Sequence, residues 1–102
     1  MSERRVVVTG IGVVSPIGND VDSFWESLCE GKNGVGRITA FDPSDFASQV
    51  AAEVKDLDPS QYVDAKTLKR MDPFCRFGIV AATQAINDSG LDLDNEELNR
   101  IE

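Results

Sequence analysis

Four basic side chains gather in a short stretch of an otherwise acidic chain, and they are Lys66, Lys69, Arg70 and Arg76. With Asp72 as the single acid among them, four cations less one acid give a local charge of +3, against a formal net charge of −8 for the chain. On a short helix, Lys66, Lys69 and Arg70 stand at positions i, i+3 and i+4 and therefore share one face. Such a face is either an ordinary solvated surface or a docking patch for an acidic protein, and the residues alone favour neither.

Two cysteines, Cys29 and Cys75, are the candidate nucleophiles. Cys75 stands near the expected start of a helix, where the helix dipole and Arg70 or Arg76 would favour a thiolate. The chain contains no histidine, so a Cys-His pair, a Ser-His-Asp triad and a His-ligated metal are excluded within it. We interpret Cys75, between Phe74 and Phe77, as a small buried hydrophobe and Cys29 as a helix-packing residue. We expect no catalytic residue, no cofactor and no metal in these 102 residues.

A glycine motif follows the first hydrophobic run. Gly10 and Gly12 begin a G-x-G-x-x-G pattern, but Ser15 stands at the third position and Pro16 follows it. A dinucleotide site needs the third glycine and a helix that begins at once, whereas the helix here is expected only near Asp20. Nucleotide binding is therefore the weaker interpretation. We favour close packing of a strand against a neighbour, which only glycine permits.

Composition limits the class of protein. A chain of 102 residues is one domain at most, and 41% hydrophobic with 27% charged residues is ordinary for a soluble protein. No apolar run is long enough to span a membrane. The chain enters a strand-like run almost at once, so we expect no signal peptide and a cytoplasmic protein. The acidic balance argues against a nucleic-acid partner.

The elements that must position these residues follow from periodicity and turn signals. We expect a two-sided strand over residues 5–14, a helix over 20–30, a loop over 32–36, a short strand over 49–54, a helical turn capped by Asp64, a long helix over 74–89 and an acidic helix after Gly90 with Leu98 and Ile101 inward.

The long helix is apolar around most of its circumference, with one narrow polar stripe. Asp72 is a plausible N-cap, Pro73 suits the first turn and Gly90 suits the C-terminal end. Small residues leave room for another backbone to approach, and they are Gly78, Ala81, Ala82 and Ala85. A chain of 102 residues offers too few elements to enclose such a helix. We therefore predict the opening portion of a larger α/β fold.

Three blocks carry a resemblance to a known family. The blocks RRVVVTGIGVVSPIGN, FWESLCEGKNGVGRITAFD and KRMDPFCRFGIVAATQAINDSGL occur in this order and cover essentially all of the chain. They resemble the β-ketoacyl-acyl-carrier-protein synthases of type II. The resemblance implies that residues 1–102 are the N-terminal part of the first half of a thiolase-type fold, a layered α/β architecture that forms homodimers.

The same resemblance implies a condensing enzyme of fatty-acid biosynthesis, which elongates acyl chains by decarboxylative Claisen condensation with malonyl-acyl carrier protein. The family's nucleophilic cysteine and two histidines lie beyond position 102, and neither Cys29 nor Cys75 matches that cysteine. The positions matching the family's carrier-protein docking residues are Lys66, Lys69 and Arg70. Three alternatives stay open: a non-catalytic chain-length factor, an inactive fragment and a nucleotide-binding module.

Overall fold

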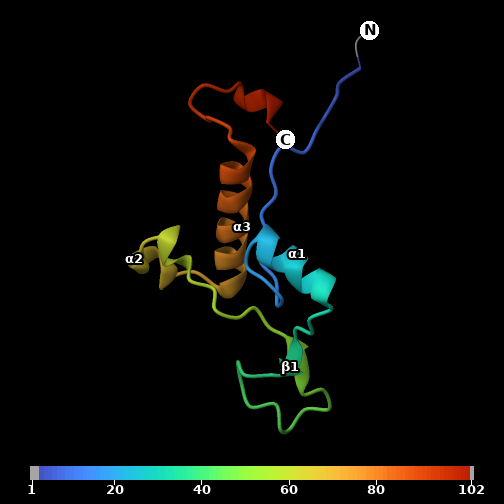
Figure 1. Ribbon diagram of the computed structural model, residues 1–102. Coiled ribbons are helices and arrows are strands. Elements are labelled where there is room, and N and C mark those ends of the chain that lie inside the picture. The colour runs from blue at the N-terminus through green and yellow to red at the C-terminus, as the bar shows by residue number, and fades with distance from the viewer. Residues whose placement is uncertain (1–2, 102) are drawn as a thin grey trace.

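A long helix, α3 (Pro73–Ser89), forms the axis of the structure. The computed structural model describes residues 3–101, and Figure 1 shows the N-terminal segment on one side of α3 and α2 on the other. The elements in chain order are α1 (Val21–Glu30), β1 (Val35–Arg37), β2 (Val50–Ala52), the 3-10 helix η1 (Pro59–Gln61), α2 (Ala65–Leu68), α3 and the 3-10 helix η2 (Leu98–Arg100). The predicted long helix is therefore confirmed to within one residue.

The ends of α3 follow the local sequence signals. Pro73 is in its first turn, and the Asp72 carbonyl accepts from the Cys75 and Arg76 amides at 3.0 and 3.3 Å. The Asp72 side chain makes no capping bond, so only its backbone position matches the prediction. Gly90 ends the helix with a φ of 68°, the left-handed conformation that glycine adopts without strain.

The segment that contains Gly10 and Gly12, which we call the glycine segment, packs directly on the backbone of α3. A Cβ at Gly10 would lie 2.2 Å from the Ala85 carbonyl oxygen, and one at Gly12 would lie 1.9 Å from the Ala81 carbonyl oxygen. The Ile11 amide donates to Asp88 Oδ2 and the Val13 amide donates to Gln84 Oε1, both at 3.0 Å. The two glycines therefore allow the close approach that the sequence predicts, and the small residues of α3 complete it.

The strand predicted over residues 5–14 is not formed as a strand. Among residues 3–101, its backbone makes no hydrogen bond to the backbone of another segment, and its bonds to α3 go to side chains. Val6, Val7 and Val8 remain 66%, 70% and 81% exposed, so both faces of the segment are open to solvent. A strand is defined by its partner, and the prediction fails because the described residues supply none.

Helix α1 confirms the prediction for residues 20–30. The Asp20 side chain accepts from the Ser23 amide at 2.8 Å, and Gly31 ends the helix at a φ of 70°. Ser27 is buried and its hydroxyl donates to the Ile17 carbonyl at 2.7 Å. Its apolar side chains are only partly covered, since Trp25 is 65% exposed.

The two strands form an antiparallel hairpin in which Gly36 faces Ala51. The expected loop over residues 32–36 is wrong at its end, because Val35 and Gly36 belong to β1, while the strand expected over 49–54 is confirmed at its centre. The Glu53 carboxylate supports the hairpin. It accepts from the hydroxyl and amide of Thr39 and from the Ala40 amide, which lowers the pKa of Glu53.

The acidic helix expected after Gly90 is wrong. Between Gly90 and Ile101 the structure forms the single turn η2, and Leu98 and Ile101 are 67% and 40% exposed rather than inward. A short helix in water depends on packing of its apolar face. The described residues leave much of both side chains open to solvent.

The described residues do not enclose a core around α3. Val80, at 1%, is the sole side chain among residues 3–101 with less than 2% exposure, whereas Phe74 is 71% exposed. The accessible surface is 8224 Å², against about 5,700 Å² for a compact monomer of this mass. The radius of gyration is 17.6 Å, against about 13 Å for a compact domain of this length. This openness agrees with the prediction that α3 needs more partners.

Helix α2 is short and is organised from its N-terminus. It has four residues, none of them buried. The Asp64 carboxylate accepts from the Thr67 amide at 3.1 Å, as the predicted cap requires, and the Asp64 carbonyl accepts from the Leu68 amide at 3.0 Å. Hydrogen bonds from the Thr67 side chain and backbone lower the pKa of Asp64 below 3.8.

We expect Gly12→Val to lift the glycine segment off α3, because its Cβ would meet a helix carbonyl that cannot rotate away. Overpacking costs about 1–3 kcal/mol, so the Ile11 and Val13 amides should exchange with solvent about tenfold faster or more in NMR measurements. Gly36→Ala is the control, since its Cβ has nothing within 4 Å. Unchanged protection in Gly12→Val would contradict the contact.

The Asp64 cap should make α2 sensitive to acid. Because the pKa is lower in the folded state, the carboxylate stabilises α2 above pH 3.8, and this contribution is lost as the pH falls through the depressed value. Backbone chemical shifts of Thr67 and Leu68 should therefore move toward coil values only below pH 3.8. Asp64→Asn retains a capping side chain and should remove this transition, whereas Asp64→Ala should fray α2 at every pH. An acid transition that persists in Asp64→Asn would refute this role.

Candidate functional site

The three cations singled out by spacing lie together on one exposed corner. Lys66 is in α2, Lys69 is its C-terminal cap and Arg70 follows directly, with its amide bonded to the Thr67 carbonyl at 3.0 Å. All three side chains are exposed, and none makes a hydrogen bond or an ion pair with another residue in the part of the chain that the structure describes. We call these three residues the basic corner. Their charges are available to an outside partner.

The positive charge of the basic corner contrasts with the negative charge of the rest of the chain. The stretch 66–76 carries +3 while the chain carries −8, so the remaining residues sum to −11. Exposed charges act over about 10 Å at 0.1 M salt, so an approaching acidic surface senses the corner at short range and the rest of the molecule much less. The acids nearest in sequence are Asp64 and Asp72, and Asp64 already accepts a hydrogen bond from the Thr67 amide as a cap.

The fourth cation of the cluster, Arg76, has a different environment. It is half-buried in the first turn of α3, and its Nη2 donates to the Leu68 carbonyl at 2.9 Å. Its Nε is buried without a hydrogen-bond acceptor in the described chain. The sequence groups Arg76 with the basic corner, but the structure turns it inward against α2. Its spacing on the polar stripe of α3 gives no signal of this bond.

The cysteines show no catalytic arrangement. Cys75 is half-buried, in keeping with a packing role, whereas Cys29 is exposed and the expectation that it packs is wrong. Within residues 3–101 no cluster of three or more His, Cys, Asp or Glu side chains is placed to hold a metal ion. The basic corner is therefore the feature of the described chain with chemistry available to a ligand.

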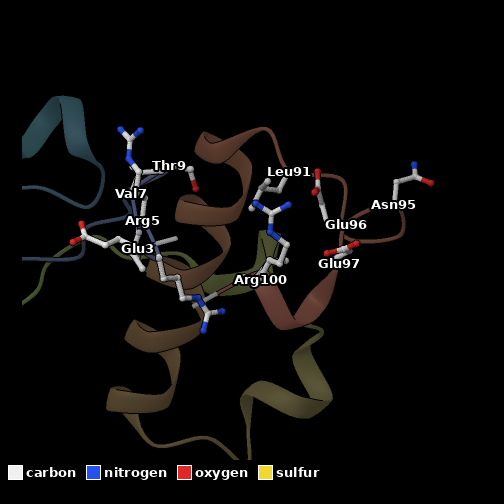
Figure 2. A pocket seen from close by; sticks show the side chains of 12 residues that line it. Glu3, Arg5, Val7, Thr9, Leu91, Asn95, Glu96, Glu97 and Arg100 are labelled. Atoms are coloured by element: carbon white, nitrogen blue, oxygen red, sulfur yellow. The ribbon is translucent and has the colours of Figure 1, made fainter. Parts of the chain in front are cut away.

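A pocket opens between the N-terminal segment and η2 (Figure 2). Its lining mixes both signs of charge, including Arg5, Arg100, Glu96 and Glu97. It borders the exposed valines, with Val6 and Val7 on its wall, and Arg4 donates to the Asn99 carbonyl across it at 3.4 Å. A pocket with mixed charge and an unpaired extended segment resembles an open sheet edge more than a ligand site.

In the described part of the chain, no helix has the length and apolar character that a membrane crossing requires.

Comparison with known proteins places this architecture. Residues 3–101 match the family described as "Beta-ketoacyl synthase, N-terminal domain". The 3-oxoacyl-[acyl-carrier-protein] synthase 2 of Synechocystis sp. is 50% identical over 102 residues, and that of Coxiella burnetii is 48% identical over 101 residues. These matches cover 100% and 99% of this chain but only 24% of each relative. The chain thus spans about a quarter of the length of the curated relatives it matches.

Solved structures agree with this assignment. A structure titled "The ishigamide ketosynthase/chain length factor" superposes with a TM-score of 0.82 at 36% identity, covering 92% of this chain and 23% of that one. A ketosynthase complex with its type II polyketide acyl-carrier protein, AntDE:AntF, gives a TM-score of 0.68 at 31% identity, covering 91% and 24%. The fold predicted from sequence, the N-terminal portion of a thiolase-type α/β fold, is confirmed. The chain belongs to the β-ketoacyl synthase family, and its residues 3–101 match the N-terminal domain of that family.

Proposed function

We propose that this chain is the N-terminal part of a condensing enzyme that elongates acyl chains on acyl carrier protein in fatty-acid biosynthesis. The observation that carries the proposal is the match of the whole chain to relatives named 3-oxoacyl-[acyl-carrier-protein] synthase 2. As the resemblance implies, the full-length enzyme would be a homodimer, and we propose a cytoplasmic location for it.

The reaction is a decarboxylative Claisen condensation. A cysteine thiolate takes the acyl chain from a carrier thioester and releases the carrier thiol. Loss of CO₂ from malonyl-acyl carrier protein leaves a carbanion, which attacks the acyl carbon and expels the cysteine thiolate. Histidines assist decarboxylation, and backbone N–H groups stabilise the oxyanion. This chain has no histidine, and neither Cys29 nor Cys75 matches the family's cysteine. We therefore propose that these groups belong to the remaining three quarters of such an enzyme. The residues described here contribute scaffold and a surface.

That surface is the basic corner, which we propose as a docking site for the acidic helix of acyl carrier protein. Support comes from the exposure of Lys66, Lys69 and Arg70, from their lack of internal partners and from their contrast with the acidic remainder. A homologous ketosynthase has been solved with its acyl-carrier protein bound. Complementary charge raises association rates more than it raises intrinsic affinity.

A non-catalytic chain-length factor is the second candidate, because a structure with that name in its title superposes well on this chain. The two candidates share this N-terminal scaffold and differ in whether the full-length protein carries the nucleophilic cysteine. The sequence that follows residue 102 in the gene therefore distinguishes them.

A chimera tests the condensing function. Residues 1–102 replace the matching quarter of the Synechocystis sp. relative, which supplies the catalytic groups. We expect the chimera to condense acyl- and malonyl-acyl carrier protein within about tenfold of the relative's own rate, a difference of about 1.4 kcal/mol in barrier. A folded chimera that decarboxylates and condenses nothing would contradict the proposal.

Charge reversal in this chimera tests docking. We expect the triple variant K66E/K69E/R70E to associate with acyl carrier protein about 10- to 100-fold more slowly at low salt, because electrostatic steering is lost. The deficit should shrink as salt rises. Stopped-flow association across an ionic-strength series measures both effects.

The matched control reverses Lys32, Arg37 and Lys55, which are also exposed, change the net charge by the same amount and lie on or near the hairpin. Turnover of a carrier-free acyl thioester should be the same in both triple variants. Equal association rates for the two triple variants would show that the basic corner is not the docking site.

A further inference from the structure

Arg76 links α3 to the end of α2. Its Nη2 donates to the Leu68 carbonyl at 2.9 Å, and the same carbonyl accepts from the Met71 amide at 3.2 Å. Leu68 is the last residue of α2, and Lys69 and Arg70 follow it directly. The guanidinium therefore fixes the C-terminal end of α2, and Lys69 and Arg70 of the basic corner extend from this end.

Helix α2 is too short to fix its own C-terminal end. It contains four residues and buries none of them, and so short a helix is unstable without outside contacts. Asp64 fixes its N-terminal end through Thr67. At the C-terminal end, Arg76 supplies the side-chain bond that comes from another element.

The environment of Arg76 separates it from the surface cations. It is half-buried, with Nε enclosed and lacking an acceptor in the described chain. A side chain held in this way does not face an incoming protein. Lysine at this position would keep the charge but lose the planar fork that directs one N–H at a carbonyl.

We infer that Arg76 is a positioning residue for carrier-protein docking, which acts by fixing the Leu68 carbonyl and hence the direction of Lys69 and Arg70. This inference rests on the proposed docking function of the basic corner. It predicts that Arg76 matters through geometry, and that its replacement by a cation of different shape does not restore docking.

The test uses the chimera described above with Arg76→Lys and Arg76→Met. Hydrogen exchange measured by mass spectrometry on peptides covering residues 65–71 should be about tenfold faster in both variants, because local opening of α2 becomes easier. Association with acyl carrier protein should slow several-fold in both, while kcat for a carrier-free acyl thioester stays unchanged. In Arg76→Lys the salt dependence of association should match the parent, because the surface charge is retained.

Arg37→Met is the matched control, since Arg37 also donates one side-chain bond, to Gln49 at 2.9 Å, but on the hairpin. It should leave exchange of residues 65–71 and carrier association unchanged. Parent-like exchange in Arg76→Met would overturn the inference, as would full recovery of association by Arg76→Lys. If the K66E/K69E/R70E variant associates normally while the Arg76 variants still loosen α2, the docking function fails but the bond to Leu68 stands.

Discussion

The contact of two glycines with the backbone of one helix organises this structure. Gly10 and Gly12 lie so close to the Ala85 and Ala81 carbonyls that any side chain would collide with α3. Two amides of the same segment bond to Gln84 and Asp88, so residues more than 70 positions apart in sequence are held together. The N-terminal segment and α3 are thereby fixed side by side (Figure 1).

One face of α3 is used by this contact, and another face, which carries Phe74 and Gly78, is exposed. A Cβ at Gly78 would meet nothing within 4 Å, and Phe74 is largely exposed. The valines of the N-terminal segment are exposed in the same way. In the proposed condensing enzyme, these apolar surfaces are where further layers of the thiolase-type fold would pack, whereas the basic corner at the end of α2 remains on the outside. The scaffold helix α3 and the basic corner are thus neighbours in the chain, joined by the short connection from α2 to α3.

Local signals allowed the sequence to predict the helices, and absent partners account for most of its errors. The Asp64 cap and the Gly90 terminus act within a few residues, and both are found as expected. The segment over residues 5–14 and the inward face of the C-terminal turn depend on neighbours that these residues do not supply. The bond from Arg76 to Leu68 was missed for a different reason. Its acceptor lies eight residues away on another element, and no periodicity encodes that bond.

Small-angle X-ray scattering of the isolated 102-residue chain shows whether α3 and the segment that carries Val6, Val7 and Val8 form a closed core of their own. If they do not, the radius of gyration should be at least 17.6 Å, the value of the open arrangement. A value near 13 Å, about that expected of a compact domain of this length, would show that these residues bury their own apolar faces and would contradict the open arrangement.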